Sequence, residues 1–165
     1  MRRTRLFTLA AIAVLLAGAC GQQESEPATA EEPAAAPAAE EQAPAALPRT
    51  TSPDGARVFF ITPADGDTVS SPVRIEFGIE GMNVVAAGVN EAHSGHHHLI
   101  IDAGLPDMGL PIPADENYVH FGDASTSTER ELAPGEHTLQ LLLGDHLHIP
   151  HDPPVMSETI TITVK

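Results

Sequence analysis

The alternation of apolar and polar residues in the C-terminal two thirds of the chain is what most constrains its fold. In VRIEFGIEG at 73–81, Val73, Ile75, Phe77 and Ile79 alternate with charged residues or glycine. Side chains two apart share one face of a strand, so this segment predicts a half-buried β-strand. No segment downstream of it shows a convincing helical period, and the pattern therefore predicts an all-β fold.

Seven short runs, separated by Gly, Pro and Asp, are predicted to be strands; six are apolar or alternating, and the polar run at 127–132 is typical of an edge strand. They lie at 58–61, 73–81, 98–102, 118–121, 127–132, 137–144 and 159–164. Short strands with turn signals at this spacing favour a single immunoglobulin-like antiparallel β-sandwich over residues 57–165. A sheet closed on itself is the alternative, because strand spacing does not decide closure.

Residues 1–19 have the three-part layout of a secretory signal peptide: a basic start, an apolar run and small residues before Cys20. The apolar run is too short to cross a membrane. LLAGAC at 15–20 resembles the lipobox of bacterial lipoproteins, which implies cleavage before Cys20 and a lipid on its thiol. By the same resemblance Gly21 implies the outer membrane, so we expect a periplasm-facing lipoprotein. A free or buried cysteine after ordinary cleavage is the alternative.

Residues 20–56 are dominated by Ala, Pro and Glu, and after Cys20 the only large apolar side chain among them is Leu47. Such a segment buries too little apolar surface to offset the entropy lost on ordering. It is therefore predicted to be a disordered tether between the lipid-bearing Cys20 and the sandwich.

The composition argues against nucleic acid as a partner and excludes a disulfide within the chain. Lys and Arg number 8 against 23 Asp and Glu, for a formal net charge of −15, which argues against nucleic acid as a partner. A single cysteine excludes a disulfide within the chain. Outside the cytoplasm, copper and zinc are bound by histidine, methionine and carboxylate groups without competition from a reducing thiol pool.

The histidines are concentrated in one part of the chain. All nine lie between His93 and His151, most of them in the segments AHSGHHH and DHLHIPH. On a strand His96 and His98 project together, whereas His97 is expected to face the core. Converging neutral imidazoles, with nitrogens about 2.0–2.1 Å from the ion, are what Zn²⁺ or Cu²⁺ binds.

Six of the nine histidines are therefore candidate metal ligands. They are His96, His98, His120, His146, His148 and His151, and Met156 is a further candidate as a thioether ligand for copper. Methionine is also a common gap-filler in cores, which is the alternative for Met156. Asp145 and Asp152 are candidates for orienting imidazoles, or for simple turn chemistry. His137 shares its strand parity with leucines and is expected to be a structural residue bonded to backbone.

Catalytic signatures are weak. The sequence has no G-x-S-x-G, no H-E-x-x-H and no glycine-rich phosphate loop. The lone thiol is assigned to lipid, so it is not free to form a Cys–His pair. We therefore expect a protein that is not an enzyme.

Three blocks resemble a known bacterial family. GHHHLIID at 95–102, LPIPADENYVHFGD at 110–123 and LAPGEHTLQLLLGDHLHIPHDPPVMSETITITV at 132–164 are similar to the domain of unknown function 4399, found in small exported proteins and lipoproteins. The resemblance implies an exported β-domain without an assigned reaction. Tyr118 departs from the expected pattern, which has a second histidine two residues before His120. This departure favours a site made by the 146–151 loop with 96–98.

These patterns lead to one main hypothesis and two alternatives. The main one is a lipid-anchored extracytoplasmic domain that binds copper or zinc, as a metal chaperone or buffer. The first alternative is a non-catalytic interaction module of the cell envelope whose histidines are structural. The second is a pH sensor, since clustered histidines titrate near neutrality. Convergence of the two histidine segments in space distinguishes the first hypothesis from the others.

Overall fold

The structure, a computed structural model, describes residues 47–165. The predicted signal peptide at 1–19, the lipidation candidate Cys20 and the tether up to residue 46 lie outside the described residues. Between residues 47 and 165 every regular element is a β-strand, in agreement with the predicted all-β class. Within that range there is no helix with the length and hydropathy needed to cross a membrane.

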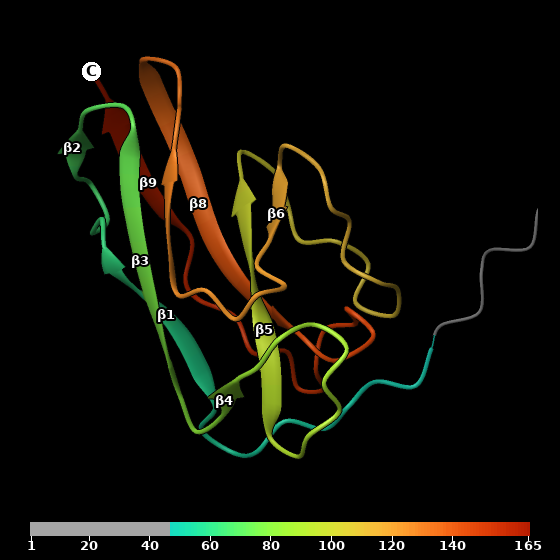
Figure 1. The fold of residues 1–165 in the computed structure, drawn as a ribbon. Coiled ribbons are helices and arrows are strands. Elements are labelled where there is room, and N and C mark those ends of the chain that lie inside the picture. Colours follow the sequence, from blue (N-terminus) through green and yellow to red (C-terminus); the bar gives the residue numbers. More distant parts are fainter. Residues whose placement is uncertain (1–46) are drawn as a thin grey trace, which may run out of the picture. The chain divides into compact units, whose positions relative to one another are not determined.

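The strands form two sheets on either side of a shared hydrophobic core (Figure 1), so the fold is a β-sandwich. One sheet has the order β1-β3-β7 and the other the order β2-β9-β8-β5-β4, with β6 paired to β5. The strands are β1 (Arg57–Thr62), β2 (Thr68–Val69), β3 (Val73–Glu80), β4 (Asn83–Val84), β5 (Ser94–Ile101), β6 (Tyr118–His120), β7 (Ser127–Arg130), β8 (Gly135–Gly144) and β9 (Ile160–Val164).

The period-two pattern that predicts β3 is also the pattern of its burial. Val73, Ile75 and Phe77 are at most 1% exposed, whereas Arg74 between them is exposed. β3 pairs antiparallel with β1 on one side and with the polar strand β7 on the other. β7 lies at the edge of its sheet, as its polar sequence predicts.

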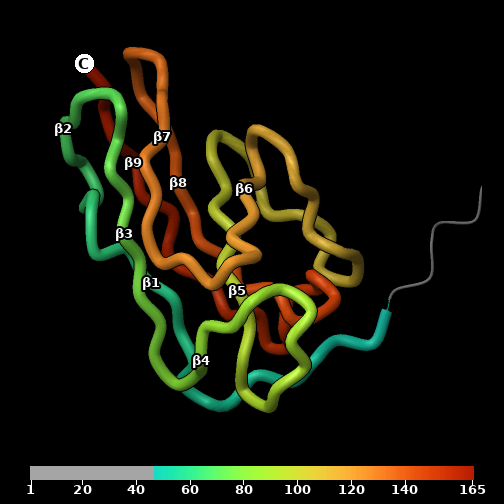
Figure 2. The backbone as a smooth tube through the Cα atoms, viewed as in Figure 1, coloured from blue at the N-terminus to red at the C-terminus, as the bar shows by residue number. Residues whose placement is uncertain are grey.

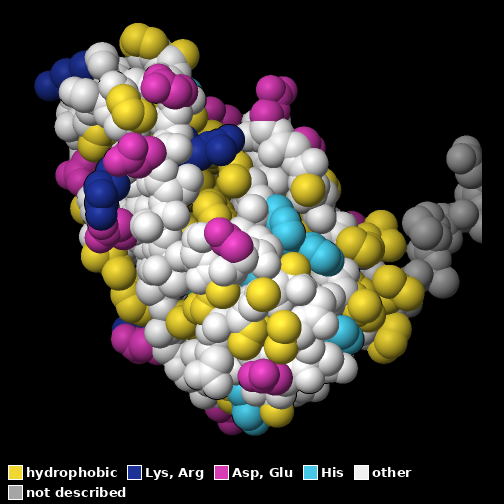
Figure 3. All heavy atoms as spheres, viewed as in Figure 1, with side chains coloured by type: hydrophobic (Ala, Val, Ile, Leu, Met, Phe, Trp, Pro, Cys, Tyr) yellow, Lys and Arg dark blue, Asp and Glu magenta, His cyan; other side chains and the backbone are white. Residues whose placement is uncertain are grey.

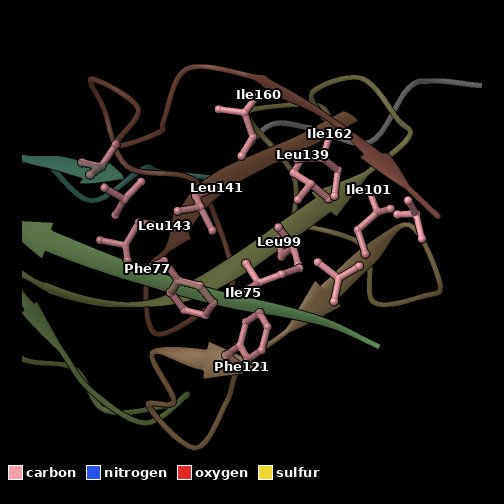
Figure 4. Close-up of a cluster of buried hydrophobic side chains, with 14 of the residues drawn as sticks. Ile75, Phe77, Leu99, Ile101, Phe121, Leu139, Leu141, Leu143, Ile160 and Ile162 are labelled. Atoms are coloured by element: carbon pink, nitrogen blue, oxygen red, sulfur yellow. The ribbon is translucent and has the colours of Figure 1, made fainter. Parts of the chain in front are cut away.

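The core joins the inner faces of the two sheets, and the rings of Phe77 and Phe121 lie side by side at one edge of it (Figure 4). The ring of Phe77 in β3 lies 5.0 Å from that of Phe121, centroid to centroid, and 4.7 Å from the imidazole of His97 in β5. Leu99 and Leu141 from the opposite sheet are fully buried beside them. His97 therefore faces the core, as its strand parity predicts.

β5 is unusual because both of its faces are buried. Its inner face contributes to the core, while on its outer face Ile100 packs with Ile112 and Leu142 in a second, smaller apolar cluster. Ile112 belongs to the long loop between β5 and β6, so this loop covers part of the outer face. The outer face of β5 is consequently a site where polar side chains are shielded from water.

The folded domain extends N-terminal to Arg57, although residues up to 56 are predicted to belong to the tether. Thr51 forms an isolated parallel β-bridge with Asp152, and the Ser52 amide donates to the Asp152 carbonyl at 3.2 Å. In Figure 2 this N-terminal segment passes beside the loop that precedes β9. This segment is held against the domain without large apolar side chains because its backbone groups form hydrogen bonds.

Candidate metal centre

Three histidines meet because of the strand register. His96 and His98 are two residues apart in β5, and both side chains project from its outer face. β6 pairs with β5 so that His120 lies directly opposite His98. Directly opposed residues in an antiparallel pair are close neighbours. One ring nitrogen from each of the three lies within 4.8 Å of the others. Strand pairing alone therefore gathers three imidazoles.

A fourth imidazole, that of His148, reaches the same place from the loop after β8. Its ring centroid lies 4.8 Å from those of His96 and His120 and 6.1 Å from that of His98. Within the strand trio the centroids are 4.9, 4.9 and 5.1 Å apart. We refer to these four residues, His96, His98, His120 and His148, as the histidine cluster.

Two glycines leave room for the rings of the cluster. A Cβ on Gly144 would lie 2.8 Å from Cε1 of His98, and a Cβ on Gly122 would lie 2.5 Å from Cε1 of His120. Both distances are shorter than any normal carbon contact, so any larger residue would displace the imidazoles. Glycine at these positions is therefore a condition for the cluster.

The cluster contains buried nitrogens that lack hydrogen-bond partners. Both ring nitrogens of His96, both of His98 and Nε2 of His120 have no partner among the described residues. His96 and His98 are at most 1% exposed. Each such buried group costs about 1–3 kcal/mol when nothing satisfies it. A metal ion would offset part of this cost, because each neutral imidazole can bind it through one of its two nitrogens.

The electrostatics of the cluster keep these imidazoles neutral. Burial, followed by the like charges of His148 and His120, lowers the pKa of His96 to about 4. Burial, with the like charges of the neighbouring histidines, lowers the pKa of His98 to about 2. The pKa of His120 is also lowered, first by burial and then by His148. The strand imidazoles are therefore in their ligand form at neutral pH.

The cluster is accessible from one side. His120 and His148 are half-buried, in contrast to the two fully buried rings from β5. Figure 3 shows histidine side chains at the surface of the sandwich with hydrophobic side chains beside them. An ion can therefore approach through the half-buried pair.

The other predicted ligands lie elsewhere. His151 is fully buried, but its ring nitrogens lie 3.4 Å from the Leu143 carbonyl oxygen and 3.2 Å from the Ser94 carbonyl oxygen, so it is bonded to backbone. His146 is half-buried next to the carboxylate of Asp145. Neither ring contacts a ring of the cluster among the described residues.

Met156 also lies apart from the cluster, since it lines a pocket with Arg57 and Phe59 of β1 and is 38% exposed. Asp152 pairs with Arg49 at 3.4 Å. Asp145, in contrast, hydrogen-bonds the loop that carries His148.

The role of His120 in β6 depends on a neighbour that is distant in sequence. Tyr118, in place of a second histidine, favours a site made by the 146–151 loop with 96–98. His120 nevertheless joins the cluster without a second histidine in its own strand. Its partner is His98 across the ladder, and that register is a tertiary property. The sequence signal that was present is the lone histidine in a short strand.

The part of the chain that forms the cluster matches one protein family. A family model described as a domain of unknown function, DUF4399, matches residues 75–165, which include all four histidines of the cluster. Comparisons with curated proteins and with solved structures found no match.

Proposed function

The chain belongs to the DUF4399 family, whose description assigns no function, and we propose that it binds a transition-metal ion through His96, His98, His120 and His148. The observation that carries the proposal is the convergence of four imidazole rings, three of which offer nitrogens within 4.8 Å of one another, together with five buried ring nitrogens that no described residue satisfies. Structural histidines are normally bonded to backbone, as His151 is. The cluster lacks such partners and its rings converge on one another, and these two observations together support a ligand role.

The spacing of the rings favours Zn²⁺ over Cu²⁺. Four imidazoles around a tetrahedral ion, bound at about 2.0–2.1 Å, place all ring centres about 5 Å apart. A square-planar Cu²⁺ site would give four separations of about 4.5 Å and two of about 6.4 Å. Five of the six observed separations lie between 4.8 and 5.1 Å, and only that between His98 and His148 is longer, at 6.1 Å. The ring nitrogens of His96, His98 and His120 already lie within 4.8 Å of one another, and His148 has to move toward His98 to complete a tetrahedral site.

The number of imidazole donors also indicates which kind of metal-binding protein this would be. Catalytic zinc sites keep one position open for water, whereas closed sites take all four ligands from the protein. Four imidazoles fill every position of a tetrahedral ion. We therefore propose a metal buffer or chaperone and not an enzyme. Half-exposed His120 and His148 would allow an ion to enter and leave.

The location proposed for this activity rests on the N-terminal sequence. The signal-peptide layout and the lipobox resemblance at Cys20 support an outer-membrane lipoprotein that faces the periplasm and is joined to the membrane by its lipid. The acidic charge of −15 supports a partner other than nucleic acid.

Metal titration of the full-length chain, extracted in detergent, tests the proposal. We expect Zn²⁺ binding with a Kd below about 10 μM, and we expect H96Q, H98Q or H148Q to weaken it by about tenfold or more, since tenfold is only about 1.4 kcal/mol. H146Q is the matched control because His146 lies two residues from His148 on the same loop. Binding weaker than about 10 μM, or equal loss in H146Q, contradicts the proposal.

Cobalt substitution tests the geometry. Co²⁺ in a tetrahedral nitrogen site gives intense visible absorption bands, whereas six-coordinate Co²⁺ gives weak ones. We expect intense bands that disappear when Zn²⁺ displaces the Co²⁺. Weak bands together with tighter binding of Cu²⁺ in a tetragonal environment would favour copper as the ion.

A further inference from the structure

The loop that carries His148 is built around one carboxylate. Oδ1 of Asp145 accepts hydrogen bonds from the amides of Leu147, at 2.8 Å, and Ile149, at 3.0 Å. The amide of His148 donates to the Asp145 carbonyl at 2.9 Å. His148 itself has a φ of 66°, in the left-handed region that non-glycine residues seldom adopt. The conformation that turns His148 toward the cluster therefore depends on the Asp145 turn.

The remaining oxygen of this carboxylate is held by a residue distant in sequence. Oδ2 of Asp145 accepts a hydrogen bond from the hydroxyl of Thr50 at 2.7 Å. Asp145 is 1% exposed, so this bond is shielded from water. Burial raises the pKa of Asp145, but the Thr50 hydroxyl and the two loop amides outweigh it, so the pKa is lowered and the carboxylate stays charged.

Thr50 is part of a short segment that crosses the same loop. Residues 49–52, which we call the strap, hold residues 150–153 of the loop by several bonds. Nε of Arg49 donates to the Pro150 carbonyl at 2.9 Å, and its second guanidinium nitrogen donates to the His151 carbonyl. Oγ of Ser52 donates to the Pro153 carbonyl at 2.8 Å. The strap therefore holds the loop at Asp145 and at residues 150–153.

We propose that Thr50 and Asp145 are positioning residues of the metal site, through which the strap holds His148 in place as the fourth ligand. This inference rests on the proposed metal-binding function. The other three ligands are positioned by the β5–β6 register and need no such support. Only His148 comes from a loop, so only its contribution to the affinity depends on the strap. Loss of the Thr50 bond leaves a three-histidine site that binds the ion less tightly.

The test compares T50V with wild type in the full-length chain, titrated with Zn²⁺. T50V keeps the side-chain shape but removes the hydroxyl, and we expect its Kd for Zn²⁺ to rise by about 10-fold to 100-fold, the usual effect of removing a group that orients a ligand. T50S retains the hydroxyl and should restore the affinity. D145N is the second variant and should give the same loss. S52A removes the strap's bond to the Pro153 carbonyl but leaves the bond between Thr50 and Asp145, so it should raise the Kd less than T50V does.

A double variant separates positioning from a general loss of structure. If Thr50 acts through His148, T50V has no further effect on the Kd in the H148Q background. Equal Zn²⁺ affinity in T50V and wild type, or an undiminished effect of T50V in H148Q, overturns the inference. Failure of the proposed function itself looks different, since wild type and H96Q would then bind Zn²⁺ equally poorly.

Discussion

At the scale of single residues, adjacent histidines in β5 have opposite environments. His97 faces the core against Phe77, while His96 and His98 face the cluster. Both ring nitrogens of His97 lack partners among the described residues, and burial lowers its pKa to about 4. His97 is too deep in the inner face to share an ion bound on the outer one. His97 is therefore a neutral side chain of the core whose ring nitrogens lack hydrogen bonds.

Replacing His97 by leucine tests this assignment. Because H97L removes two unpartnered buried nitrogens and keeps a similar volume, we expect the free energy of unfolding of the metal-free protein to rise by about 1 kcal/mol. The Zn²⁺ affinity should not change. Chemical denaturation and metal titration measure the two quantities. H98L is the control and should lose affinity, and a comparable loss in H97L would show that His97 is a ligand.

At the scale of elements, a histidine–carboxylate pair joins the end of β5 to the start of β8. Nδ1 of His137 lies 2.6 Å from Oδ2 of Asp102, and Nε2 lies 2.9 Å from the Ala133 carbonyl oxygen. Oδ1 of Asp102 accepts from the Thr138 amide at 2.8 Å. Two acceptors around one ring favour the doubly protonated imidazolium. The Asp102 carboxylate, followed by the Ala133 carbonyl, accordingly raises the pKa of His137.

This pair predicts a pH dependence of stability with a definite sign. Because the pKa of His137 is higher in the folded than in the unfolded chain, its stabilising effect is complete below the unfolded value of about 6.5 and disappears as the pH rises through the folded value. H137Q should therefore lower the free energy of unfolding by up to about 1 kcal/mol at pH 5.5, and by a smaller amount at pH 9. Urea denaturation of the metal-free protein at the two pH values measures this.

D102N provides the control for the same measurement. It retains the bond to the Thr138 amide but removes the charge that stabilises the imidazolium. The stability difference between D102N and wild type should follow the same pH profile as that of H137Q. A cost of H137Q that is constant between pH 5.5 and 9 would contradict the role given to the charged pair.

At the scale of the whole molecule, the cluster ties together parts of the chain that are far apart in sequence. His96 and His98 come from β5, His120 from β6 and His148 from the loop after β8. An unfolded chain does not hold these residues together, so the metal ion proposed for the cluster would bind the native state preferentially. Binding of this kind stabilises a fold by about 2.7 kcal/mol when the free ligand is at 100 times its Kd.

We therefore expect Zn²⁺ to raise the Tm of the full-length protein, and the H96Q/H98Q double variant to lose this response. Thermal unfolding with and without Zn²⁺ measures the effect. Ca²⁺ is the control for general attraction to an acidic chain, because it prefers oxygen ligands and should leave the Tm nearly unchanged. An equal rise in Tm with Ca²⁺, or in the double variant, would assign the stabilisation to carboxylates and not to the cluster.

The strands of this protein could be predicted from sequence because their signal is local. Apolar residues at every second position predict β3 and β9, and the same parity places His97 inside and His96 and His98 together outside. Very short strands such as β2 and β4, each of two residues, carry no such period and were not predicted.

The composition of the cluster was decided by tertiary structure. The β5–β6 register brings His120 opposite His98, and the Asp145 turn aims His148 at them, whereas His151 is directed to backbone carbonyls. Register and loop conformation depend on contacts between residues distant in sequence, such as that between Thr50 and Asp145. Sequence periodicity acts over a few residues, so it determined the faces of the strands, while long-range packing determined which histidines meet.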